Sequence, residues 1–110
     1  MLDIETVRKI AHDYAAVVIK ALDPKKIILF GSYVNGNPHE WSDIDIAVIF
    51  NGFQGNWHDT AALLHSLRRE INDISPAGIE PHLMDEQHDP SGFLEHVVKV
   101  GEVIYEVRSG

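Results

Sequence analysis

Two aspartates, Asp43 and Asp45, stand two residues apart at the start of an apolar segment. In an extended strand, residues i and i+2 project from the same face, about 7 Å apart along the backbone. Two carboxylates this close repel each other unless a cation lies beside them, so the pair predicts a site for a hard divalent cation such as Mg²⁺ or Mn²⁺. The alternative is an ordinary solvent-facing Asp pair, which is common on protein surfaces.

A glycine and a serine, Gly31 and Ser32, follow directly after an apolar run over residues 26–30. Glycine permits a sharp turn after a buried strand, and such a turn presents backbone N–H groups and a hydroxyl to phosphate oxygens. A Gly-Ser pair alone also fits a plain turn. Together with the aspartate pair, it favours a substrate that carries phosphate.

The combination Gly31-Ser32, ten intervening residues, and Asp43-Ile44-Asp45 resembles the signature of the DNA-polymerase-β-like nucleotidyltransferase superfamily. The resemblance is closest to its minimal nucleotidyltransferase (MNT) branch and extends over the whole chain. It implies an α/β (α+β) nucleotidyltransferase fold with a short mixed sheet. It also implies transfer of a nucleoside monophosphate, AMP from ATP as the expected case, with two Mg²⁺ ions as cofactors, Mn²⁺ as their substitute and pyrophosphate as leaving group.

The resemblance also assigns roles to individual residues. Gly31 and Ser32 would bind the triphosphate of the nucleotide. Asp43 and Asp45 would be catalytic metal ligands, and Glu80 is our choice for the third catalytic carboxylate, also as a metal ligand. A carboxylate on a neighbouring strand could bind the metal nearer the acceptor or receive the acceptor's proton.

Two departures from the family pattern bear on activity. The family usually has Asp where this chain has Glu80, and Pro81 follows it. Basic residues that often follow the family's Gly-Ser are replaced here by Tyr33, Val34 and Asn35. Weaker triphosphate binding, or a member without activity, would be the consequence.

Three further residues near these motifs could contribute. His82 lies two residues after Glu80 and therefore shares its strand face. We interpret His82 as a neutral, partly buried histidine with a hydrogen-bond partner, in preference to a catalytic group. Trp41 and Trp57 flank the aspartate strand and could stack on a base, but packing is the commoner role and neither is assigned to the site.

The elements that must position these residues follow from hydrophobic periodicity. The pattern predicts helix, strand, strand, helix, strand, helix, strand, in the order of a mixed α/β layer structure with the helices on one sheet face. Pro81 predicts an edge or irregular strand. The expected segments are a helix from Ile4 to Ala21 stopped by Asp23-Pro24, strands over 26–30, 43–50, 79–84 and 102–107, a helix through Leu64, Leu67, Ile71 and Ile74 ending at 75–78, and a helix capped by Asp89-Pro90 that carries Phe93, Leu94, Val97 and Val98.

Composition limits the class of protein. The 110 residues match one average globular domain, so we expect a single domain over 1–110. A net charge of −8 disfavours broad binding to DNA. The chain has no cysteine, no basic-then-apolar leader and no apolar run long enough to cross a membrane, so we expect a cytoplasmic protein without membrane association.

Two classes of function stay open. The resemblance implies an antitoxin that modifies a tyrosine hydroxyl of a HEPN-domain toxin, so the acceptor would belong to a partner and not to this chain. The alternative is an inactive module that neutralises a partner by contact alone. A haloacid-dehalogenase-type phosphatase is disfavoured because its apolar strand precedes the first Asp, whereas here the apolar run follows Asp43. The sequence leaves a homo-oligomer open.

Overall fold

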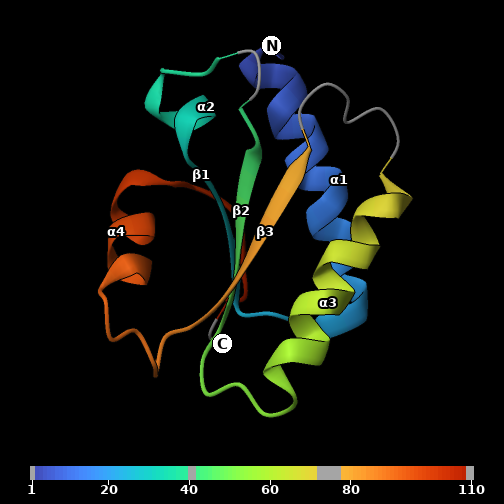
Figure 1. Cartoon of the computed structure of the whole chain (residues 1–110), viewed down its shortest axis with the longest axis vertical. Coiled ribbons are helices and arrows are strands. Elements are labelled where there is room, and N and C mark those ends of the chain that lie inside the picture. Colours follow the sequence, from blue (N-terminus) through green and yellow to red (C-terminus); the bar gives the residue numbers. More distant parts are fainter. Residues whose placement is uncertain (1, 40–41, 72–77, 109–110) are drawn as a thin grey trace.

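The computed structural model describes residues 2–39, 42–71 and 78–108, and Figure 1 shows the arrangement of its helices and strands. Trp41, Ile74 and most of the predicted helix exit at 75–78 lie outside the described residues. The elements in chain order are α1 (Ile4–Leu22), β1 (Lys26–Phe30), α2 (Ser32–Asn35), β2 (Ile44–Phe50), α3 (Trp57–Leu67), a 3₁₀ turn (Arg68–Glu70), β3 (Ile79–Asp85), α4 (Phe93–Val100) and β4 (Glu102–Glu106).

Helix α1 forms where the three-and-four spacing of apolar residues predicts it. Asp3 caps its first turn by accepting a hydrogen bond from the N–H of Thr6 at 2.8 Å. Asp23 ends it in the left-handed region, at φ 55°, and Pro24 cannot continue it. The helix buries Tyr14 completely, and the Tyr14 hydroxyl donates to the carbonyl of Leu64 in α3 at 2.6 Å. Burial raises the pKa of this phenol, so it stays a donor.

The four strands form one mixed sheet in the order β3-β2-β1-β4. Strand β1 pairs antiparallel with both β2 and β4, whereas β2 and β3 run parallel and α3 lies on the connection between them. Strand β3 is at the sheet edge, where Pro81 costs no ladder hydrogen bond on the open side. The prediction from Pro81 is therefore confirmed.

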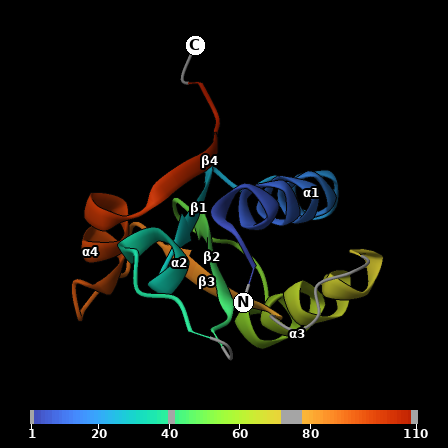
Figure 2. The same ribbon diagram turned by 90° about the horizontal axis from the view of Figure 1, so that it is seen from above.

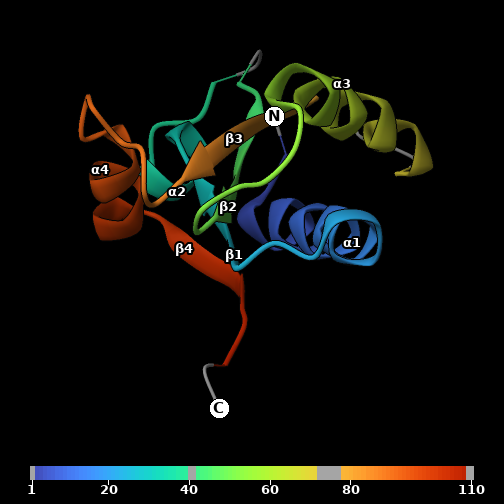
Figure 3. The ribbon, with the colours of Figure 1, turned by 90° about the horizontal axis from the view of Figure 1, so that it is seen from below.

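The two faces of the sheet are covered differently. Helices α1 and α3 cover one face and α4 lies on the other, as Figures 2 and 3 show from opposite ends of the molecule. The α/β fold class with a short mixed sheet is confirmed, but the expectation that all helices share one face is wrong for α4. The reason is that Leu94 and Val97 of α4 pack on Ile28 and Ile49, which alternate with the residues facing α1.

Two further predictions need correction. Strand β2 begins at Ile44, so Asp43 lies just before the strand. Asp89 is not the N-cap of the last helix, because Gly92 occupies that position. The Asp89 carboxylate instead reaches over the turn and accepts from the N–H groups of Leu94 and Glu95 at 3.1 and 3.2 Å, so it still satisfies two helix-end donors.

Candidate active site

The strand pairing brings the predicted site residues to one end of the sheet, the end that is drawn uppermost in Figure 1. Strand β1 ends there while β2 and β3 begin there, because β1 is antiparallel to β2 and β3 is parallel to it. Phe30 pairs with Asp45, and Asp45 pairs with Glu80. Segments far apart in the sequence are thereby adjacent at this end, about 4.8 Å from strand to strand.

Gly31 and Asp45 are in direct contact. Gly31 has φ 89° and ψ −159°, a combination open essentially only to glycine. A Cβ atom at position 31 would collide with the Oδ2 atom and the rest of the Asp45 carboxylate. The glycine is therefore required twice, for its backbone conformation and for the space that the Asp45 carboxylate fills.

The turn after Gly31 is a single helical turn. The Gly31 carbonyl accepts hydrogen bonds from the N–H groups of Val34 and Asn35 at 3.1 and 2.9 Å. Ser32 is half-buried at the first position, where backbone N–H groups have no partner within the helix. Tyr33 is buried and Val34 packs on the core, so neither residue occupies the open side of the turn where a triphosphate would lie.

Asp43 is exposed between two fixed points. Ser42 before it is buried, and its hydroxyl accepts from the N–H of His39 at 2.8 Å. Ile44 after it donates its N–H to the carbonyl of Gly78 at 2.8 Å. The backbone on both sides of Asp43 is therefore anchored while its carboxylate faces solvent.

Glu80 lies on the strand that neighbours β2, as the sequence analysis expected of a third carboxylate. Its register partner is Asp45, and residues paired in register share a face of the sheet. Ile79 and Leu83 lie on the opposite face, which packs against α1 and α3. Glu80 is half-buried on the strand next to Asp45.

His82, which the sequence did not assign to the site, also belongs to this group of side chains. Its Nε2 atom lies 3.1 Å from Oδ1 of Asp45. An ionised carboxylate can only accept, so Nε2 is the donor of this hydrogen bond when Asp45 is ionised. The imidazole also packs on the ring of Phe30, with centroids 5.0 Å apart. The expected hydrogen-bond partner of His82 thus exists, and it is a predicted metal ligand.

The family model of the polymerase β nucleotidyltransferases matches residues 12–109. This chain belongs to that family. The matched segment includes every residue that the sequence analysis placed in the site. A comparison with curated proteins finds no significant match.

Solved structures share the nucleotidyltransferase fold. A Sulfolobus solfataricus protein assigned as a nucleotidyltransferase matches with a TM-score of 0.68 and 20% identity, over 97% of this chain and 86% of that one. A toxin–antitoxin structure with AMP-PNP matches with a TM-score of 0.58 and 23% identity, over 88% and 74%. A variant of the toxin–antitoxin MntA-HpeT in which two aspartates are replaced by glutamate has a TM-score of 0.56 and 21% identity, with the same coverage.

The donor set of this nucleotidyltransferase suits a hard cation. Asp45 and Glu80 offer carboxylate oxygens from two neighbouring strands and Asp43 from the residue before β2, which is the ligand chemistry of Mg²⁺ and Mn²⁺. Within residues 2–39, 42–71 and 78–108, no three His, Asp or Glu side chains are already arranged around one point. The backbone pairs Asp45 with Glu80, and the side chains of Asp43 and Glu80 would have to turn toward Asp45 to share an ion with it.

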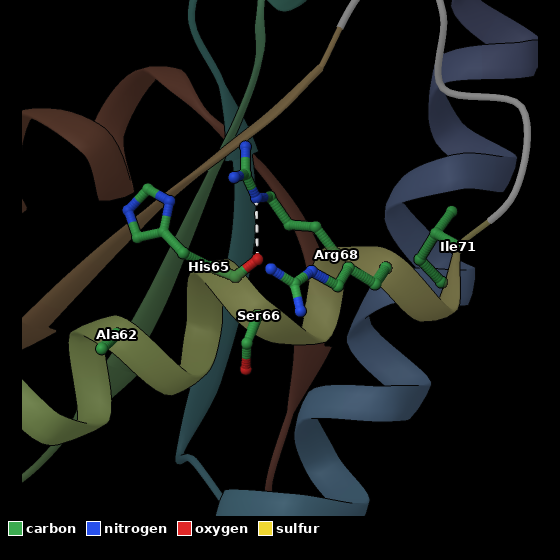
Figure 4. A pocket seen from close by; sticks show the side chains of 6 residues that line it. Ala62, His65, Ser66, Arg68 and Ile71 are labelled. Atoms are coloured by element: carbon green, nitrogen blue, oxygen red, sulfur yellow. Dashed lines mark hydrogen bonds between the residues drawn. The ribbon is translucent and has the colours of Figure 1, made fainter.

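A hollow of the nucleotidyltransferase lies elsewhere. It has a volume of about 520 Å³ and is lined by residues at the end of α3 and the 3₁₀ turn, as Figure 4 shows: Ala62, His65, Ser66, Arg68, Arg69 and Ile71. Arg68 donates there to the carbonyl of His65 at 2.9 Å and to that of Ile79 at 3.1 Å. Its guanidinium therefore serves the helix end and the start of β3, on the opposite side of the sheet from Asp45.

Proposed function

We propose that this nucleotidyltransferase moves a nucleoside monophosphate, AMP from ATP, to a hydroxyl of a partner protein. The supporting observation is the contact of Gly31 with Asp45 together with the Asp45–Glu80 register pair. It joins a turn suited to phosphate with two carboxylates at one end of the sheet. Family membership supports the general class of reaction.

The residues of the site divide the work. Gly31 and Ser32 would bind the triphosphate through backbone N–H groups and the hydroxyl, and Asp43, Asp45 and Glu80 would hold two Mg²⁺ ions. The positive charge of the bound ions would stabilise the attacking and leaving oxygens during an in-line displacement at the α-phosphate. The acceptor O–H loses its proton, its oxygen forms the new P–O bond, and the bond to pyrophosphate breaks. Glu80 is the candidate to receive the proton.

The proposed partner is a HEPN-domain toxin whose tyrosine hydroxyl is the acceptor, which would make this chain a cytoplasmic antitoxin. Two of the structures with this fold are toxin–antitoxin complexes, one of them with AMP-PNP. In the part of the chain that the structure describes, no helix is long and apolar enough to span a bilayer. The acceptor on the partner would complete the site.

The decisive experiment measures whether a phosphate label passes from ATP to the partner protein. The chain is mixed with a HEPN-domain partner and with ATP labelled at either the α- or the γ-phosphate, with Mg²⁺ or with EDTA. We expect label on the partner only from α-labelled ATP and only with Mg²⁺. The Glu80→Gln variant should transfer at least about tenfold more slowly. Asp59→Asn, which changes an exposed carboxylate of α3, is the matched control and should leave the rate unchanged.

A binding-only antitoxin is the second candidate. Tyr33 and Val34 are turned toward the core where the family often has basic residues, so the turn lacks a cation for the triphosphate. Neutralisation of the toxin by the chain without any transfer of label, and equally well by Asp45→Asn, would establish this function in place of the first. Equal transfer by Glu80→Gln and the parent would remove Glu80 from the metal site.

A further inference from the structure

The Asp45 carboxylate has a hydrogen bond on one oxygen and a close contact with Gly31 on the other. Oδ1 lies 3.1 Å from Nε2 of His82, and Oδ2 lies against Gly31, where no side chain fits. The Asp45 and His82 side chains are 26% and 31% exposed, so their hydrogen bond is partly shielded from water. A short side chain near a strand end would otherwise exchange between rotamers.

His82 is itself held from behind. Its ring packs on Phe30 with centroids 5.0 Å apart and an interplanar angle of 60°, and Phe30 packs edge-on against Phe93 of α4 at 5.9 Å. Phe30 is buried and is also the register partner of Asp45. The imidazole is therefore placed by Phe30, the residue directly before Gly31, and it has little freedom to move away from Asp45.

The hydrogen bond leaves Asp45 able to bind a cation. An ionised carboxylate has about four lone-pair sites, and His82 occupies one of them. Carboxylates that ligate metals are commonly held in this way by a second hydrogen-bonding group, whose loss typically weakens metal binding about 10- to 100-fold. A histidine two residues after the third carboxylate gives this chain such a group on the neighbouring strand.

We infer that His82 is a positioning residue that, with Gly31, clamps the Asp45 carboxylate in the orientation that binds metal. The inference rests on the proposed function for the role of Asp45, and it adds a residue that acts through Asp45 and does not touch the substrate. It explains why a polar ring occupies an otherwise apolar contact with Phe30.

The test compares two substitutions of His82. His82→Leu removes the N–H donor but keeps apolar volume beside Phe30, and His82→Gln restores an N–H donor at a similar reach. Binding of Mn²⁺ in the presence of AMP-PNP is measured by electron paramagnetic resonance, without turnover. We expect about 10- to 100-fold weaker Mn²⁺ binding in His82→Leu and recovery of most of that loss in His82→Gln. His12→Leu, an exposed histidine of α1, is the matched control and should bind as the parent does.

Unchanged Mn²⁺ affinity in a folded His82→Leu variant would overturn the clamp. Tighter binding would also overturn it, because His82 would then compete with the cation for Asp45. If the parent binds Mn²⁺ but transfers no nucleotide, the proposed function fails while the clamp stands.

A metal-free measurement covers the case in which His82→Leu does not fold or the parent binds no Mn²⁺. The ¹⁵N signal of His82 Nε2 should shift in Asp45→Asn and stay in place in Asp43→Asn, because His82 Nε2 is hydrogen-bonded to Asp45. Identical His82 signals in the parent and in Asp45→Asn would show that the contact does not exist in solution.

Discussion

The two faces of strand β2 differ sharply although they share one backbone. Ile44, Ile46 and Val48 point toward α1 and α3 and are fully buried in one apolar cluster. On the other face, Ala47 and Ile49 are equally buried under α4, but Asp45 is partly open and contacts Gly31 and His82. One face of β2 is thus fully buried at Ile44, Ile46 and Val48, whereas the other face is partly open at Asp45.

The two faces of β2 therefore contribute to different properties: one face stabilises the fold, and the open end of the other face carries the site. Residues that hold the sheet on the helices alternate along the same strands with residues that form the site, so each kind can be changed alone. A substitution on the face that α1 and α3 cover should lower the free energy of unfolding with little effect on the intact site. A substitution at the open end should change metal binding and transfer while the fold persists.

The largest expected effect is on the face of β2 that α1 and α3 cover. Ile46→Ala removes buried apolar volume from a fully enclosed position and should lower the free energy of unfolding by about 2–5 kcal/mol. Urea denaturation measures this loss, and the folded fraction should still bind Mn²⁺ as the parent does. A loss below about 1 kcal/mol would show that the cluster around Ile46 repacks, and would weaken the division between the faces.

The second effect concerns transfer. Asp45→Asn removes the charge of a proposed metal ligand at nearly constant volume and should slow transfer at least about a hundredfold, about 2.7 kcal/mol in the transition state. The melting temperature should stay the same or rise, because one like charge is removed beside Glu80. Asp43→Asn should behave alike. Parental transfer rates in either variant would disprove the metal assignment of that residue.

A pair of glycines sharpens the comparison at the open end. Both Gly31→Ala and Gly36→Ala place a side chain at positive φ, but only at position 31 would the new Cβ meet the Asp45 carboxylate, since nothing lies within 4 Å at position 36. Gly31→Ala should cost about 2 kcal/mol more stability than Gly36→Ala and should also lose Mn²⁺ affinity. Equal costs would contradict both the glycine-only backbone conformation at position 31 and its contact with Asp45.

The smallest effect lies at the far end of β3, where Asp85 accepts hydrogen bonds from the N–H groups of Gly52, Phe53 and Gln87 at 2.7–2.9 Å. Burial raises the pKa of this carboxyl, but the donors of Gln87, Phe53 and Gly52 together lower it below its ordinary value of 3.8. Asp85→Asn should therefore cost about 1 kcal/mol at pH 7.

The pH dependence of that cost has a defined sign. A lowered native pKa stabilises the fold above the unfolded-state pKa, and this stabilisation is lost as the pH falls through the native value. The difference between Asp85→Asn and the parent should shrink below about pH 4. Unfolding measured at pH 7 and pH 3 tests this, and a difference independent of pH would contradict it. Transfer at pH 7 should not change.

Much of this fold could be predicted from local patterns. The apolar spacing of α1, the doubly buried β1 and the edge position of β3 each follow from residues within one element, and each is confirmed. The neighbouring strands of Asp45 and Glu80 were also predicted, because a shared cation requires them.

Other features depend on contacts between distant segments. Helix α4 could have packed on either face from its own pattern, and its position follows from the alternation of Ile28 and Ile49. The hydrogen bond of His82 to Asp45 depends on a parallel register that no local pattern encodes. The signal that could have suggested it is a histidine two residues after a predicted ligand, on a strand expected to neighbour the aspartates.

The parallel pairing of β2 with β3 also has a consequence for the order of folding. Asp45 can pair with Phe30 by closing a short loop, whereas its pairing with Glu80 must wait until the chain has passed through α3. Closing the longer loop costs more entropy, so the contact of β1 with β2 should form first and β3 should join a sheet that already exists. The nucleotide site would then be among the last parts to assemble, and partly folded chains would hold Gly31 beside Asp45 while lacking both Glu80 and His82.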